Sequence, residues 1–189
     1  MSVKSVAAAV AGLSLALAGV SVANAEMKAE KTVMVGGAAM YPSKTIVENA
    51  VNSKDHTTLV AAVQAAGLVD TLASPGPFTV FAPTNAAFAK LPGGAVDGLL
   101  KPESKAALTG VLTYHVVPGR MSARDLMAKV KAGGGKAMLK TAQGENLTVS
   151  QHGSGLMVWD AKGGSAMVTI ADVNQSNGVI HVVDTVLMP

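Results

Sequence analysis

The side chains with the widest chemical repertoire in this sequence are its four histidines, and one of them, His181, lies three residues before Asp184. A histidine that is oriented by a carboxylate can act as a general base, as in the Ser-His-Asp sites of hydrolases. Both residues fall in the segment 177–189, where an Asn-Gly turn signal precedes a β-branched run that predicts a strand buried on both faces. Side chains three positions apart in a strand point to opposite faces, so the two groups cannot serve one reaction or one metal ion. We therefore expect each of them to be hydrogen-bonded within the core.

Of the other three histidines, His115 is the one most open to a functional role. His115 follows Tyr114 and precedes a Pro-Gly turn, at the end of a helix or the start of a strand. His56 and His152 fall in a helix-cap loop and a β-turn, where we expect solvated side chains. The sequence has no His-x-His or Glu-x-x-His spacing, no carboxylate cluster and no cysteine, so it lacks a thiol nucleophile and a metal-ligand pattern. We predict no catalytic residue, no metal and no cofactor.

The elements that must position these residues change in type along the chain. Amphipathic spacing, caps and closing glycines predict helices in the first part, and β-rich segments separated by glycine turns follow. The predicted helices cover about 45–50, 55–66, 102–113 and 122–132, and the predicted strands cover about 78–82, 136–141, 146–151, 156–159, 166–173 and 179–187. Helices followed by a run of strands are typical of the α+β class with a mainly antiparallel sheet.

The first 40 residues have a different composition. Lys4 precedes an apolar stretch at 6–22 that ends in Ala-Asn-Ala, which predicts a secretory signal peptide at 1–25. The alternative of a membrane anchor is less favoured because the stretch falls short of about 20 strongly apolar residues. Residues 26–40 show little periodicity, so we expect a leader or linker there and a single domain at 41–189. The net charge of +3 and the scattered lysines do not favour nucleic-acid binding.

Three segments, taken together, resemble the fasciclin domain family. They are 78–88, the Tyr114-His115 pair and 177–189, and they are intact and in order. The residues that carry the resemblance in the first and third segments are Phe81, Pro83, Thr84, Asn85 and Phe88, and Asn177, Gly178, His181 and Asp184. The resemblance covers about 41–189. It implies a fasciclin-like fold, in which helices pack on a wedge of mainly antiparallel β-strands, and a role in adhesion or extracellular interaction without a general catalytic chemistry.

The resemblance also implies where binding would take place. In animal fasciclin domains the Tyr-His region is linked to integrin binding, which would make Tyr114 and His115 the candidate binding residues near an exposed surface. A second integrin-linked segment of the family, an Asp-Ile pair, is matched loosely by Asp172 and Val173. In the alternative interpretation, Tyr114 is a core residue with a paired hydroxyl. Trp159, the only tryptophan, is either a core residue or an exposed contact.

We therefore expect an exported, non-catalytic binding module for cell adhesion or for interaction with the envelope or extracellular matrix, periplasmic or secreted. The short exported form resembles the bacterial members of the family. The expected partner is a surface protein or polysaccharide, with no nucleic acid and no stable membrane insertion after signal removal. Two alternatives stay open: a small-molecule-binding or enzymatic domain with a pocket near His115, and an envelope structural protein with weak self-association.

Overall fold

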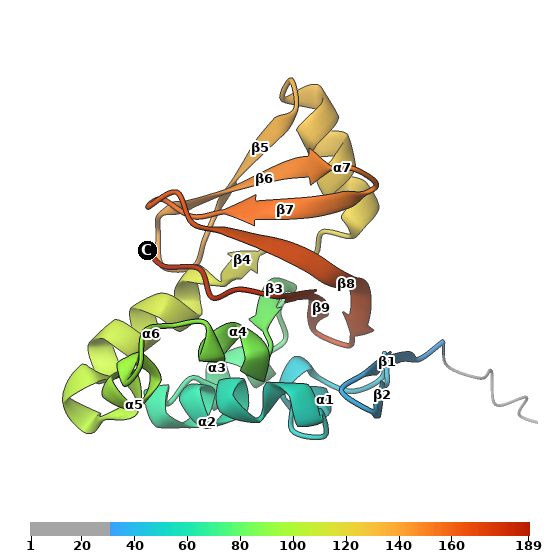
Figure 1. Ribbon diagram of the computed structural model, residues 1–189. Helices are drawn as coiled ribbons and strands as arrows, with labels where there is room; N and C mark the ends of the chain where they lie inside the picture. The colour runs from blue at the N-terminus through green and yellow to red at the C-terminus, as the bar shows by residue number, and fades with distance from the viewer. Residues whose placement is uncertain (1–30) are drawn as a thin grey trace, which may run out of the picture.

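The computed structural model describes residues 31–189, so the predicted signal peptide at 1–25 lies outside the described residues. A layer of short helices lies beneath a twisted sheet, and one further helix leans on the far end of that sheet (Figure 1). The helices are α1 (Ile46–Ala50), α2 (Thr57–Ala66), α3 (Val69–Ala73), α4 (Asn85–Ala89), α5 (Ala95–Leu100), α6 (Lys105–Tyr114) and α7 (Ala123–Ala132). The strands are β1 (Val33–Val35), β2 (Ala38–Met40), β3 (Phe78–Pro83), β4 (Val116–Pro118), β5 (Lys136–Lys140), β6 (Asn146–His152), β7 (Gly155–Trp159), β8 (Ser165–Gln175) and β9 (Gly178–Val183).

The main sheet has the strand order β4-β3-β9-β8-β7-β6-β5. All of its neighbouring strands pair antiparallel except β3 and β9, which pair parallel with Phe81 opposite His181. This architecture confirms the predicted α+β class and the mainly antiparallel sheet. It also shows that the first and third resemblance segments supply β3 and β9, the second and third strands of the sheet, which we call the central strands because both of their faces are covered.

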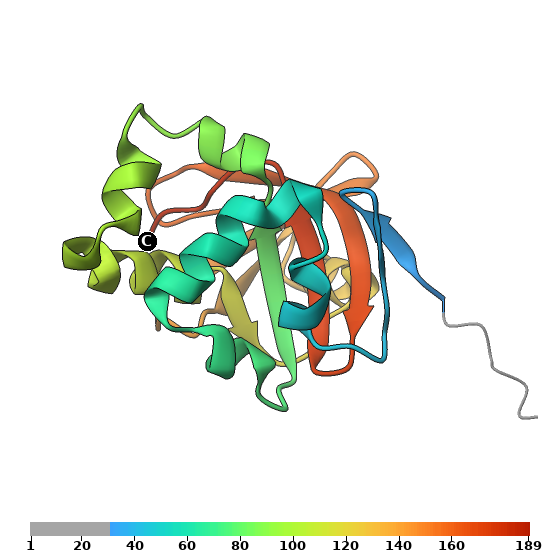
Figure 2. The same ribbon diagram turned by 90° about the horizontal axis from the view of Figure 1, so that it is seen from below.

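Strands β3 and β9 separate two hydrophobic cores. Val80, Ile180 and Val182 face the core that the helical layer covers, and Phe81 and Val183 face the core beneath α7 and strands β5–β8. Figure 2 shows the helical layer lying across the face of these central strands. Every residue of β9 is buried, because both faces of this strand are covered. The unbroken β-branched run of the sequence is explained by this position.

The polar residues of the resemblance segments fasten the helical layer to the sheet. Thr84 is the N-cap of α4, and its hydroxyl accepts a hydrogen bond from the Ala87 amide at 3.2 Å. The side chain of Asn85 instead joins α4 to the start of α2, where its oxygen accepts from the Thr58 amide at 3.0 Å. The side chain of Asn177 accepts a hydrogen bond from the Ile46 amide at the start of α1, at 3.0 Å. These side chains therefore hold the first turns of three helices.

Gly178 allows the closest backbone approach in this region. A Cβ atom at this position would lie 2.3 Å from the Phe78 carbonyl oxygen and 3.0 Å from the Ile46 side chain. Only a residue without a side chain fits between β3 and α1 at this point. The glycine of the Asn-Gly turn signal is thus required by packing.

The expected leader at 26–40 is wrong for its second half. Residues 33–40 form an antiparallel hairpin, β1–β2, that turns at Gly36 and Gly37, both with positive φ. Val35 and Met40 are buried in the core under the helical layer. Each strand has only three residues, which is too short for an alternating pattern to stand out from the sequence.

Candidate functional site

His181 is a fixed part of the core. Its ring is fully buried, 5.7 Å from the ring of Phe81, and it bridges two backbone groups. Nε2 donates to the Met121 carbonyl at 2.9 Å, and Nδ1 accepts from the Asp172 amide at 3.3 Å. Because an amide can only donate and a carbonyl can only accept, these partners fix one neutral tautomer. Burial lowers the pKa of His181, which further favours the neutral ring.

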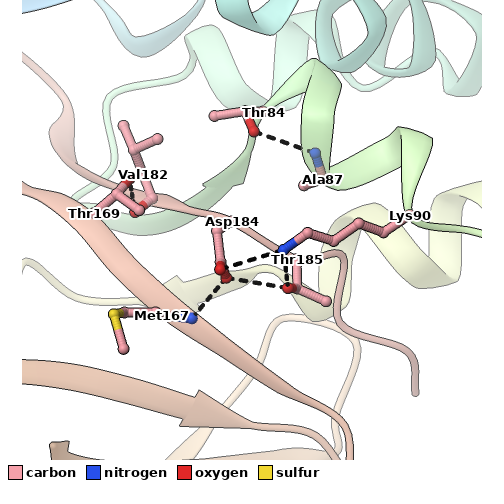
Figure 3. Close-up of polar contacts among 8 residues, drawn as sticks. All are labelled: Thr84, Ala87, Lys90, Met167, Thr169, Val182, Asp184 and Thr185. Carbon is pink, nitrogen blue, oxygen red and sulfur yellow. Dashed lines mark hydrogen bonds and ion pairs between the residues drawn. The ribbon is translucent and has the colours of Figure 1, made fainter.

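Asp184 lies beyond the end of β9 and has partners of its own (Figure 3). One carboxylate oxygen accepts from the Met167 amide at 2.8 Å and from the Thr185 hydroxyl at 3.0 Å, and the other lies 3.3 Å from Lys90 Nζ. Partial burial alone would raise the pKa of Asp184, but these hydrogen bonds and the Lys90 charge lower it overall. The hydrogen bonds of Asp184 do not include His181, so the two side chains are not paired in this structure.

Tyr114 and His115 are both buried at the end of α6, so the expectation that they lie near an exposed surface is wrong. The Tyr114 hydroxyl donates to the Asn146 carbonyl at 3.1 Å and accepts from the Ala161 amide at 3.0 Å. Burial raises the pKa of this hydroxyl. The alternative interpretation, in which Tyr114 is a core residue with a paired hydroxyl, is therefore confirmed.

His115 uses both ring nitrogens on the backbone. Nδ1 donates to the Val111 carbonyl at 2.8 Å, and Nε2 accepts from the Leu187 amide at 3.0 Å. This is the opposite neutral tautomer to that of His181. Burial lowers the pKa of His115 to about 4. Neither histidine has a free lone pair with which to activate a substrate.

Asp172 and Val173 lie at an irregularity of strand β8, where its register with β9 shifts. Asp172 has a φ of 58°, in the left-handed region that aspartate tolerates better than most residues, and its carboxylate accepts from the Ala123 amide at the start of α7, at 2.7 Å. Val173 is buried. Of the four predicted binding residues, only His115 and Val173 line the same cavity.

That cavity lies between the β1–β2 hairpin, helices α1 and α2, and the central strands, and its volume is about 80 Å³. A pocket near His115 was one of the alternatives that the sequence analysis left open, and this cavity has His115 in its wall. His56, which we expected to be solvated, is also buried in its wall. Among residues 31–189, no three His, Cys, Asp or Glu side chains come close enough together to hold a metal ion.

The sequence left open whether Trp159 is buried or exposed, and the structure places it on an exposed apolar surface. The outer face of β5–β8 carries the large apolar side chains Met138, Met157, Trp159 and Met167, which we call the methionine–tryptophan face. Met138, Trp159 and Met167 are exposed by 68%, 37% and 39%, and Met157 is half-buried. The strand register brings them together, because Met157 pairs with Met167, and Thr148 of β6 pairs with both Met138 and Trp159. Helix α7 covers the opposite face of these strands.

Strand alternation in the sequence separates the residues of the two sheet faces, but it does not show which face is exposed. Buried residues at 137, 139, 156 and 158 flank the exposed ones, so each strand shows its period of two. Which set faces solvent depends on α7, and the sequence does not show where α7 packs. The Trp159 indole is held in place, because Nε1 donates to the Ser150 hydroxyl at 2.9 Å.

Comparisons with known proteins agree with this fold. The family model of the fasciclin domain matches residues 54–189. The chain is 48% identical over 170 residues to "Protein sll1483" of Synechocystis sp., covering 89% of this chain and 87% of that protein. It is 40% identical over 143 residues to "Immunogenic protein MPB70" of Mycobacterium bovis, covering 73% of this chain and 65% of that protein.

A solved structure gives the same answer at the level of the fold. A FAS1 domain pair from the insect cell adhesion molecule fasciclin I matches with a TM-score of 0.70 at 19% identity, over 79% of this chain and 52% of that chain. None of the helices between residues 31 and 189 has the length and hydropathy needed to span a membrane. From the matched segment and the shared fold, the chain belongs to the fasciclin domain family.

Proposed function

We propose that this protein is an exported, non-catalytic binding module, which attaches through its methionine–tryptophan face to a surface component of the envelope or extracellular matrix. The observation that carries the proposal is the exposure of three large apolar side chains on one sheet face that no other part of residues 31–189 covers. Tryptophan and methionine are enriched in protein interfaces, and tryptophan is frequent among the residues that dominate binding energy.

The composition around this face suits a contact that forms and dissociates. Lys136 and Lys140 lie on the same side of β5 as Met138. Thr148 and Ser150 lie on the side of β6 that belongs to the methionine–tryptophan face. A polar rim around an apolar centre is the usual arrangement at such interfaces. Because the Ser150 hydroxyl already holds the Trp159 indole, less side-chain freedom is lost on binding.

The non-catalytic part of the proposal is supported by the hydrogen bonds of the buried histidines and of Asp184. His115 and His181 each spend both nitrogens on backbone partners, and Asp184 is hydrogen-bonded to a separate set of groups. The export part rests on the signal peptide predicted at 1–25. A further relative, 34% identical over 170 residues and 70% covered by this chain, is named a cell surface glycolipoprotein, MPB83 of Mycobacterium bovis.

A retention experiment tests the proposed function. The mature protein is passed over immobilised envelope polysaccharides and envelope proteins of its own organism, and retention on one or the other identifies the partner class. We expect Trp159→Ala and Met138→Ser to abolish retention. Met34→Ser is the matched control, because Met34 is 60% exposed and lies on the distant β1–β2 hairpin. Equal retention of all three variants, with unchanged melting temperatures, would exclude this face as the binding site.

Self-association is a second candidate that the same face supports, since an uncovered apolar sheet face can also pair with a second copy. Sedimentation velocity over a range of concentrations distinguishes the two. A dimer that Met138→Ser dissociates would assign the face to self-association. A monomer at all concentrations would leave it for a partner.

A further inference from the structure

We propose that an open groove beside Arg120 binds a carboxylate-bearing sugar unit of an acidic polysaccharide. The groove has a volume of about 440 Å³ and lies where the loop before β3 meets the turn between β8 and β9. These two segments lie side by side in Figure 2, and the Phe78 amide donates to the Asn177 carbonyl between them at 3.1 Å. The groove shares no residue with the methionine–tryptophan face, so one proposal can fail without the other.

Arg120 supplies the positive charge of the groove. Its Nη2 donates to the Asn174 side-chain oxygen at 3.1 Å and to the Gln175 carbonyl at 2.9 Å. A guanidinium has five N–H donors and Nη2 carries two of them, so the three on Nη1 and Nε are left for a ligand. Because the two contacts with β8 already hold the guanidinium in place, less side-chain freedom is lost on binding.

The charge around Arg120 matches a single carboxylate. Among residues 31–189, no acidic side chain lines the groove. Glu48, which contacts the lining residue Thr45, is held in the capping box of α1, where it accepts from the Thr45 amide at 2.7 Å. The Lys44 ammonium lies over the Tyr41 ring, 5.1 Å from its centroid, and is not part of the groove wall. One guanidinium balances the single charge of a carboxylate, whereas a phosphate group carries nearly two negative charges.

The rest of the wall suits a sugar ring. Ser176 is exposed, and its hydroxyl has no hydrogen-bond partner among residues 31–189. Ala73, Pro75 and Pro77 give the same groove an exposed apolar surface. A sugar presents hydroxyl groups at its edge and C–H groups on its faces, so it can use both kinds of surface. A volume of a few hundred Å³ with a few polar groups among apolar ones is typical of small-molecule sites.

The backbone of the groove disfavours an acidic peptide as the ligand. Residues 75–78 include two prolines, which have no N–H group. The Gly76 amide donates to the Ser74 carbonyl at 2.8 Å, and the Phe78 amide is bonded to the turn between β8 and β9. An extended peptide that added along this loop would leave its carbonyls without donors. A sugar does not need such a row of backbone partners.

Amide NMR titration of the isotope-labelled protein with a galacturonic acid trisaccharide tests the proposal. We expect saturable shifts of the Gly76, Ser176 and Gly178 amide signals, and no saturable shifts with the neutral galactose trisaccharide at the same concentrations. Arg120→Gln should weaken binding of the acidic trisaccharide about tenfold, as expected for loss of a charged hydrogen bond. Arg124→Gln is the matched control, because Arg124 is also exposed and lies on α7, outside the groove.

A second variant leaves Arg120 in place. Ala73→Glu adds a carboxylate to the exposed wall of the groove and should abolish binding of the acidic trisaccharide, whereas Ala73→Gln, of the same size, should weaken it less. Equal binding of the acidic and neutral trisaccharides, or an unchanged affinity in Arg120→Gln, would overturn the role of the carboxylate. A triglutamate peptide that binds more tightly than the acidic trisaccharide would overturn the assignment to a sugar. The absence of saturable shifts at the three amides would overturn the site itself.

Discussion

At the scale of single residues, the buried histidines act as fixed hydrogen-bonding groups rather than as acids or bases. Each of them bonds to a backbone group that is distant in sequence: His115 to the Leu187 amide, and His181 to the Met121 carbonyl. That these residues are paired in the core follows from strand periodicity and from the cost of burying an unpaired polar group. Their partners could not be predicted, because each partner is a backbone atom positioned by the completed fold.

The lowered pKa values of His56, His115 and His181 predict acid sensitivity below neutral pH. In the unfolded chain a histidine binds a proton near pH 6.5, whereas folded His115 stays neutral down to about 4. Stability is therefore complete above pH 6.5 and decreases as the pH falls from 6.5 to 4, by roughly 3 kcal/mol for His115 alone. Urea unfolding between pH 7.5 and 4 measures this loss.

The variant His115→Gln serves as the control for that experiment. It should be less stable at pH 7.5, since one of the two backbone partners is lost. Its free energy of unfolding should then fall less steeply between pH 6.5 and 4. The lowered carboxylate pKa of Asp184 acts mainly below its ordinary value of 3.8 and contributes little above pH 4. A wild-type stability that stays constant from pH 7 to 4.5 would contradict the prediction.

Removing the His181 side chain should destabilise the fold without touching a binding surface. His181→Ala leaves the Met121 carbonyl and the Asp172 amide unpaired and opens a space beside Phe81. We expect a loss of about 3–5 kcal/mol in the free energy of unfolding. Exposed His152→Ala should change it by less than about 0.5 kcal/mol. A His181→Ala protein that melts like the wild type but loses its partner would instead assign a binding role to this histidine.

At the scale of elements, the strength of the local signal decided what could be predicted. Helix α2 was predicted from its i, i+3, i+4, i+7 spacing and its closing glycine, and α7 from the Ser122–Asp125 capping box. The hairpin β1–β2 and the short helices α3 and α5 were not predicted. The strands of the hairpin have three residues each and the two helices have five and six, and their positions are set by packing against the rest of the domain.

The two glycines of the hairpin turn should respond differently to substitution. Both have positive φ, so either change to alanine strains the backbone by about 1 kcal/mol. At Gly36 the new Cβ would also lie 2.4 Å from the Ser53 hydroxyl oxygen, whereas at Gly37 nothing lies within 4 Å. We expect Gly36→Ala to lower the melting temperature more than Gly37→Ala does, as differential scanning calorimetry can measure. Equal effects would show that the hairpin does not depend on this contact.

At the scale of the whole molecule, the two cores share their central strands. Since β3 and β9 contribute to both cores, neither core can lose its packing without exposing the other. We expect one cooperative unfolding transition. Trp159 fluorescence, which reports on the sheet beneath α7, and far-ultraviolet circular dichroism, which is dominated by helix, should give the same urea midpoint. A fluorescence change at a clearly lower urea concentration would show that β5–β8 unfold separately.

The hydrogen bond that the Ile46 amide, at the start of α1, donates to the Asn177 side chain spans 131 positions of the sequence. The same carboxamide donates to the carbonyls of Leu72 and Ser74, so one residue ties three distant parts of the chain together. Contacts at such separation close large loops before they gain energy, and domains rich in them fold slowly. The consequence is kinetic: the helical layer has no finished template until β9 has inserted beside β3. During that interval the chain exposes strand edges, and it is then most open to aggregation or to capture by chaperones.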